Sequence, residues 1–196
     1  MNMIPKNTAK LILFLLRSIE RFGYNTNQLS KLLNMSVGSA FKILKELEKN
    51  NIVISQTIGT AVNYTLNFDN PETVKLCELL LLEKKRLLSG YVKLYGDSLQ
   101  KFESAELIIL FGSVLTKKEY RDVDVLFVTK KSKEVHTFCL GLSKIRTRPV
   151  VPLILTKEDL VNEGKKKKDA IVSLLQEGVI LRGESVFVEV MNRVQK

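Results

Sequence analysis

The chain has 196 residues, of which 45% are hydrophobic and 27% charged, and its formal net charge at pH 7 is +10. This balance indicates a globular protein with one large or two small cores, and no apolar run reaches the roughly 18 residues of a membrane span. The positive charge is spread over both halves of the chain. It favours a polyanionic partner such as nucleic acid or a nucleotide, although a surface that only keeps the protein in solution explains it equally well.

The cysteine and histidine content gives no sign of a metal centre or of a Ser-His-Asp triad. Cys77 and Cys139 lie far apart in the chain, and His136 is the only histidine. We interpret the cysteines as buried thiols of a protein in the reducing cytoplasm. The apolar stretch at residues 11–16 is short and lacks a cleavage pattern, so it predicts a core helix and not a signal peptide.

Three helices are predicted in the first fifty residues. Helical spacing of apolar residues predicts the first over residues 8–21, which Gly23 ends by accepting a positive φ. Residues 25–26 offer a cap for a short second helix, and Ser36 caps a third helix that runs to about Lys49. We expect the inner side of this third helix to carry Val37, Ala40, Phe41, Leu44 and Leu47. A short helix, a turn and an amphipathic helix form a helix-turn-helix.

A two-stranded hairpin is predicted next, because apolar residues alternate on both sides of residues 58–60. The segment NQLSKLLNMSVGSAFKILKELEKNNIV resembles the pattern of the winged-helix family of archaeal and bacterial regulators. The resemblance covers residues 8–68 and departs at Asn51, where the family usually has glycine. It implies a winged-helix DNA-binding domain of three helices and a hairpin, which we place at residues 1–70.

The outer face of the third helix would contact double-stranded DNA if that helix enters a major groove. The candidate DNA-binding residues on this face are Ser36, Gly38, Ser39, Lys42 and Lys45. The alternative is that they are solvent-facing positions on a dimerisation module. No Lys or Arg lies between Lys49 and Lys75, so the hairpin lacks the usual phosphate contacts. We therefore expect DNA binding to need a homodimer.

Residues 71–103 are predicted to form a long helical linker. Pro71 is suited to a helix start, and a break is expected at residues 89–90. The apolar stripe of this segment fits two arrangements equally well, which are pairing with a second copy and packing against its own winged helix.

Two predicted strands carry the chemistry of the C-terminal half. The apolar residues 107–111 end in Gly112 and Ser113, and Asp122 and Asp124 begin a second apolar run. Aspartates at positions i and i+2 of a strand point to the same face. Two adjacent carboxylates repel each other, and Mg²⁺ is the usual compensating cation. A surface turn followed by an edge strand is the plainer alternative.

The segment LFGSVLTKKEYRDVDVLFV resembles the signature of the polymerase-β-like nucleotidyltransferases, and especially of their minimal nucleotidyltransferase branch. Its spacing is two residues shorter than in the common form, and residues 114–117 replace the usual RARG. The resemblance implies a small mixed-sheet domain at residues 104–196, so the expected fold class is α+β. In that domain Gly112, Ser113 and Lys117 would bind an NTP, and Asp122 and Asp124 would hold Mg²⁺ as the catalytic carboxylates.

One departure from the family bears on catalysis. Catalytic members normally have a third carboxylate on a later strand, and the corresponding residues 149–155 contain no Asp or Glu. The next acids, Glu158 and Asp159, are expected on the following helix. A lysine run, residues 165–168, is expected to start a further helix through residue 175, where it either binds an anion or is simply solvated.

Three functions are therefore compatible with the sequence. The first is a DNA-binding transcriptional regulator whose second domain binds Mg²⁺-nucleotide as an effector or has lost catalysis. The second is an active transferase that moves a nucleotide from an NTP to a hydroxyl of a protein or a small molecule. The resemblance to toxin–antitoxin nucleotidyltransferases implies a HEPN-type protein partner for that case. The third is an interaction module with neither activity.

Overall fold

The computed structural model describes residues 4–116 and 119–196, and the fold is α+β. The chain divides into two compact units, Met1–Leu80 with Gln195–Lys196 and Leu81–Val194. The boundary at residues 80–81 falls inside the helix α4 (Pro71–Arg86). Among the described residues, no helix is long and apolar enough to cross a membrane.

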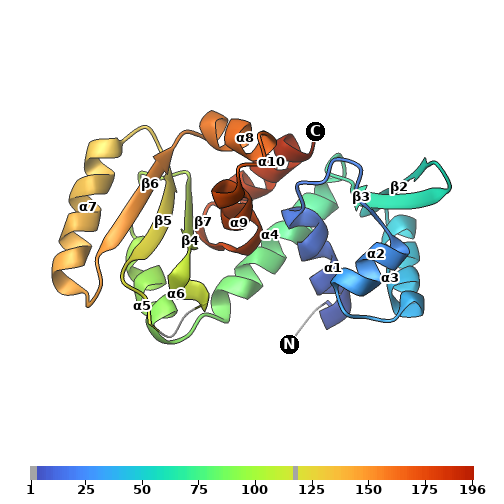
Figure 1. The fold of residues 1–196 in the computed structure, drawn as a ribbon, viewed down its shortest axis with the longest axis horizontal. Helices are drawn as coiled ribbons and strands as arrows, with labels where there is room; N and C mark the ends of the chain where they lie inside the picture. The colour runs from blue at the N-terminus through green and yellow to red at the C-terminus, as the bar shows by residue number, and fades with distance from the viewer. Residues whose placement is uncertain (1–3, 117–118) are drawn as a thin grey trace. The chain divides into compact units, whose positions relative to one another are not determined.

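The first unit contains helices and one small antiparallel sheet (Figure 1). Its elements before α4 are α1 (Lys6–Arg17), β1 (Tyr24–Asn25), α2 (Thr26–Leu32), α3 (Val37–Lys49), β2 (Val53–Ile58) and β3 (Ala61–Leu66). The strand order is β1-β3-β2, and β3 is antiparallel to both neighbours. The predicted hairpin is present, with its turn at residues 59–60.

Helix caps in the first unit follow the sequence signals. The Asn25 side chain accepts a hydrogen bond from the Gln28 N–H at 2.9 Å, and the Gln28 side chain accepts one from the Asn25 N–H, which completes a capping box. The Ser36 hydroxyl accepts a hydrogen bond from the Ser39 N–H at 3.1 Å and so begins α3. These bonds satisfy N–H groups that the helix itself leaves without acceptors.

The end of the first helix was predicted wrongly. Helix α1 ends at Arg17, because Ser18 is extended, and Gly23 has a different role. Gly23 has φ +66°, and a Cβ there would overlap the backbone oxygen of Tyr64. The glycine lets the chain pass close to β3, where β1 pairs Tyr24 with Tyr64.

The expected inner side of α3 was only partly right. Ala40, Leu44 and Leu47 are buried, but Val37 is 50% exposed and Phe41 is 51% exposed. The buried stripe is narrower than the apolar pattern suggested. Val37 and Phe41 stand at its side, on the solvent-facing part of the helix.

The second unit is built on a four-stranded mixed sheet of order β6-β5-β4-β7 (Figure 1). The strands are β4 (Leu107–Phe111), β5 (Val123–Val128), β6 (Val150–Leu155) and β7 (Val179–Arg182). Strand β4 is antiparallel to β5 and β7, and β6 is parallel to β5. The helices are α5 (Gly90–Leu99), α6 (Ser113–Thr116), α7 (Ser132–Ile145), α8 (Lys157–Lys165), α9 (Asp169–Glu177) and α10 (Glu184–Gln195).

Both faces of this sheet are buried. On one face Ile108 and Phe127 join a core with Tyr95 of α5 and Cys139 of α7. On the other face the side chains of Leu107, Ile109, Leu126 and Val128 are fully buried. The segment expected to be a linker is therefore not uniform. It breaks at residues 87–89, and α5 packs into the core of the second unit.

The lysine run lies between two helices and only its last residue caps the second one, which corrects the expectation that the run begins a helix. Lys165 ends α8, Lys167 has φ +53°, and α9 begins only at Asp169. Lys165 and Lys166 lie at the C-terminus of α8, where lysines interact favourably with the helix dipole, whereas Lys168 is the N-cap of α9. Lys166 and Lys168 also pair with Glu163.

Candidate functional site

A glycine turn and a carboxylate meet where β4 ends. Phe111, the last residue of β4, pairs with Asp124 of β5. The next residue, Gly112, has φ +79°. A Cβ at Gly112 would lie 3.3 Å from Cβ and Cγ of Asp124 and would overlap its Oδ2 atom. The backbone of the turn therefore touches the carboxylate, and a larger residue would displace it.

The two aspartates lie at the beginning of β5. Asp122 immediately precedes the strand, Asp124 is its second residue, and both are partly buried. Burial raises the pKa of Asp124, and the negative charge of Asp122 raises it further. The pair is thus electrostatically unfavourable on its own, and a bound cation would relieve it.

The third carboxylate of the catalytic pattern has no counterpart on the neighbouring strand. Strand β6 places Val151 beside Asp124, and Val151 is 45% exposed. An apolar side chain therefore stands next to the carboxylate pair. Among the residues that the structure describes, no group of three His, Cys, Asp or Glu side chains is arranged to hold a metal ion.

Glu158 and Asp159 lie at the wrong end of the sheet to replace the missing acid. Strands β5 and β6 run parallel, so these residues follow the end of β6 that is distant from Asp122. Five residue steps along a strand separate the two ends by about 17 Å. Asp159 is also engaged locally, because it accepts hydrogen bonds from the Thr156 N–H at 3.2 Å and from its hydroxyl at 2.7 Å.

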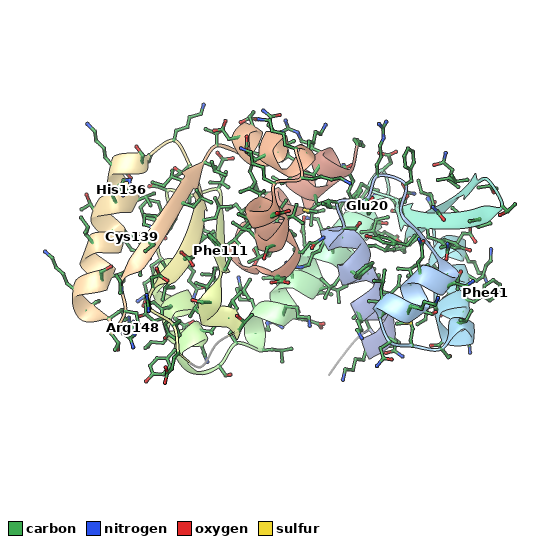
Figure 2. The ribbon with its side chains drawn as sticks, viewed as in Figure 1. Glu20, Phe41, Phe111, His136, Cys139 and Arg148 are labelled. Carbon is green, nitrogen blue, oxygen red and sulfur yellow. The ribbon has the colours of Figure 1, made fainter. Side chains whose placement is uncertain are left out.

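A cavity of about 740 Å³ opens beside the glycine turn, within the second unit. This volume lies in the range of roughly 300–1,000 Å³ that is usual for small-molecule sites. Its walls are largely apolar, with several hydroxyl groups and one carboxylate. The lining residues are Leu87, Leu88, Ser89, Val92, Phe111, Gly112, Ser113, Leu115, Thr116, Ser173, Glu177 and Val179. Figure 2 labels Phe111, which lies at the end of β4.

The carboxylate pair borders this cavity without lining it. Gly112 belongs to the cavity wall and touches Asp124, whereas Asp122 and Asp124 are outside the wall. Gly112 is therefore the residue that lies next to both the cavity and the Asp124 carboxylate. Comparisons with protein-family models, curated proteins and solved structures gave no match. The interpretation of the site consequently depends on its own geometry.

Ser173 and Glu177 of α9 were missed from the sequence. Their hydroxyl and carboxylate are 3.4 Å apart, and both line the same cavity as a turn sixty residues earlier in the chain. No local pattern marks such a position, since it depends on how α9 packs. Lys117, expected to bind the nucleotide, lies outside the described residues.

The residues expected to contact DNA lie together at the start of α3 and along it. Gly38 and Lys42 are exposed, Ser39 is half-buried, and the Ser36 hydroxyl is occupied as the cap. Lys45 is exposed and pairs with Glu48 at 2.8 Å. The hairpin next to α3 presents apolar side chains in place of cations, since Ile54 and Val62 are 49% and 43% exposed.

Proposed function

We propose that this chain is a DNA-binding regulator whose second unit binds a Mg²⁺-nucleotide as an effector. The observation that carries the nucleotide site is the contact between Gly112 and Asp124 at the edge of a cavity of about 740 Å³. A glycine that exposes backbone, a carboxylate pair and a cavity are what binding a metal-bound phosphate chain requires.

The proposal includes a winged helix in the first unit. Its element order supports this, since a short strand, a helix-turn-helix and a hairpin follow α1. The third helix α3 would enter the major groove, and Lys42 and Lys45 would contact phosphates. The absence of Lys and Arg between Lys49 and Lys75 supports a homodimer as the binding form.

The proposal also includes a nucleotidyltransferase-like second unit that does not catalyse efficiently. Two carboxylates and the phosphates of a nucleotide suit Mg²⁺, which prefers oxygen donors and often takes only one or two protein carboxylates. The Val151 side chain beside Asp124 leaves no third carboxylate there to deprotonate an attacking hydroxyl. Asp122 and Asp124 would hold the ion, and Gly112 and Ser113 would contact the phosphates.

A second candidate function is nucleotide transfer, which one observation favours. Glu177 lines the same cavity as Ser113, so it offers a carboxylate that could accept the proton of an attacking hydroxyl. Incubation with labelled ATP and a HEPN-type protein tests this. Labelling that requires both Asp124 and Glu177 would promote this function over the effector role.

Calorimetry with ATP tests the nucleotide site. We expect binding in Mg²⁺, loss of at least tenfold in affinity in EDTA, and a similar loss in the double variant Asp122→Asn, Asp124→Asn. Glu158→Gln is the matched control, because this exposed carboxylate lies at the far end of β6. Equal affinity for ATP in the wild type and the double variant would show that Asp122 and Asp124 do not form the nucleotide site.

Fluorescence anisotropy with duplex DNA at increasing salt tests the first unit. Affinity should fall as salt rises, because released counterions drive the binding. Lys42→Ala should weaken binding to every sequence, whereas the exposed Lys133 of the second unit should tolerate alanine. Absence of binding to any duplex at low salt contradicts the regulator function.

A further inference from the structure

Two apolar side chains project from the solvent-facing part of α3. Val37 is 50% exposed and Phe41 is 51% exposed, and Figure 2 labels Phe41 on this helix. They are four residues apart, so they are neighbours on the helix surface, one turn apart. Single exposed apolar residues are common on proteins. This pair is unusual because it lies among the residues expected to contact DNA.

Polar and cationic neighbours surround the pair. Gly38 follows Val37, and a Cβ at Gly38 would meet no atom within 4 Å, so nothing covers the backbone there. Lys42 follows Phe41 and is exposed. The Nζ atom of Lys45 lies 5.9 Å from the centre of the Phe41 ring. The result is a short apolar stripe with lysines along its border and free access from solvent.

This arrangement matches the chemistry of a DNA major groove. The groove is bordered by phosphates, which lysines can neutralise, and its floor presents polar base edges with one apolar group, the C5-methyl of thymine. An apolar stripe with cations beside it therefore complements a groove that contains thymines. A second copy of the chain fits less well, because a two-fold interface on this stripe would bring the lysines of both copies together.

We propose that Val37 and Phe41 contact thymine C5-methyl groups, so that α3 selects duplexes with thymine at the base pairs it faces. This specificity rests on the proposed binding of DNA through α3. Contact with a side chain removes the methyl group from water, and one buried methyl changes affinity by about fourfold. Phosphate contacts by Lys42 and Lys45 add affinity for every sequence without adding selectivity.

The test removes the C5-methyl group of thymine without changing base pairing. A duplex selected from a random pool by the full-length protein is synthesised with dT, or with dU at single positions, and dissociation constants are measured by anisotropy. We expect dU at one or two positions to lower affinity about fourfold each. Phe41→Ala should abolish the difference between dT and dU at one of these positions, and Lys42→Ala should lower affinity for both duplexes alike.

The outcomes separate this inference from the proposed function. Binding of dT and dU duplexes with equal affinity at every position overturns the thymine contact and leaves DNA binding standing. Binding of no duplex removes the regulator function and the thymine contact together. If Phe41→Ala leaves DNA affinity unchanged but converts a dimer to a monomer in light scattering, the stripe binds a second copy and the inference is wrong. Because Phe41 is half exposed, thermal unfolding should confirm that its replacement preserves the fold.

Discussion

Gly112 links the turn, the carboxylates and the cavity, so its replacement affects stability and binding together. Alanine there would adopt a disfavoured positive φ and press against Asp124. We expect Gly112→Ala to destabilise the protein by about 1–3 kcal/mol and to lower affinity for Mg²⁺-ATP at least tenfold. Thermal unfolding by circular dichroism and calorimetry measure the two effects.

Gly141 provides a control for this prediction, because its replacement by alanine should change stability in the opposite direction. It lies within α7, and a Cβ there would meet no atom within 4 Å. Alanine is the better helix former by roughly 0.8–1.0 kcal/mol, so Gly141→Ala should stabilise the protein and leave ATP binding unchanged. If Gly112→Ala also stabilised it, the close approach to Asp124 would be contradicted.

Asp124 should destabilise the fold whenever it is ionised and no cation is bound. Burial and the charge of Asp122 raise its pKa, so the folded chain binds this proton more tightly than the unfolded chain does. The destabilisation is fully present above the raised pKa of the folded state and is lost as pH falls from that pKa to the lower pKa of the unfolded chain. Asp124→Asn should therefore raise the melting temperature at neutral pH, with a smaller gain at acidic pH.

Magnesium gives the complementary measurement for Asp124. An ion that binds only the folded state stabilises it. Mg²⁺ with ATP should therefore raise the melting temperature of the wild type and leave the melting temperature of Asp124→Asn unchanged. A variant that is less stable than the wild type at neutral pH without Mg²⁺ would contradict the unfavourable charge pair.

At the level of elements, the first turn of α3 combines a structural and a proposed functional role. The Ser36 hydroxyl caps the helix through the Ser39 N–H, and loss of such a cap costs about 1 kcal/mol. Ser36→Ala should lower the melting temperature, whereas Ser36→Asp should retain the cap. The added charge of Asp should weaken DNA binding, because it would face phosphates. If DNA affinity instead changes in parallel with the melting temperature in both variants, Ser36 has a purely structural role.

Local signals explain which elements the sequence predicted well. Strand β4 is an unbroken apolar run, and α3 has a serine cap and a buried stripe, so both were predicted close to their bounds. Strand β1 has only two residues and exists through pairing with β3, which no local pattern reveals. The end of α8 at Lys165 was missed, because Lys167, with φ +53°, occupies the position where a glycine would have indicated a helix end.

For the candidate site too, some features follow from local sequence signals and others depend on tertiary packing. The sequence placed Gly112 and the two aspartates in one motif, but the approach of Gly112 to Asp124 follows from the register that pairs Phe111 with Asp124, which the structure shows. The positions of Glu177 and Val151 could not be predicted, since each depends on packing or register with a distant segment. The exposure of Val37 and Phe41 could not be predicted either, because an apolar pattern does not distinguish a buried residue from one at the side of the buried stripe of α3.

For the whole molecule, an effector role requires that nucleotide and DNA influence each other's binding. Coupling between two sites is a free energy that both ligands share, so each must change the affinity of the other by the same factor. We expect Mg²⁺-ATP to change the DNA dissociation constant by about 5- to 150-fold. Anisotropy measures this change, and calorimetry with and without DNA measures the reciprocal change in ATP affinity.

The double variant Asp122→Asn, Asp124→Asn identifies the site through which this coupling acts. It should bind DNA as the wild type does without nucleotide, and its DNA affinity should not respond to Mg²⁺-ATP. If the wild type binds both ligands but neither affinity changes, the nucleotide is not an effector, whatever its affinity. Bound Mg²⁺-ATP would then be a substrate or a structural ligand, and Glu177, the one carboxylate among the described residues lining the cavity, would become the first residue to replace in an assay for nucleotide transfer.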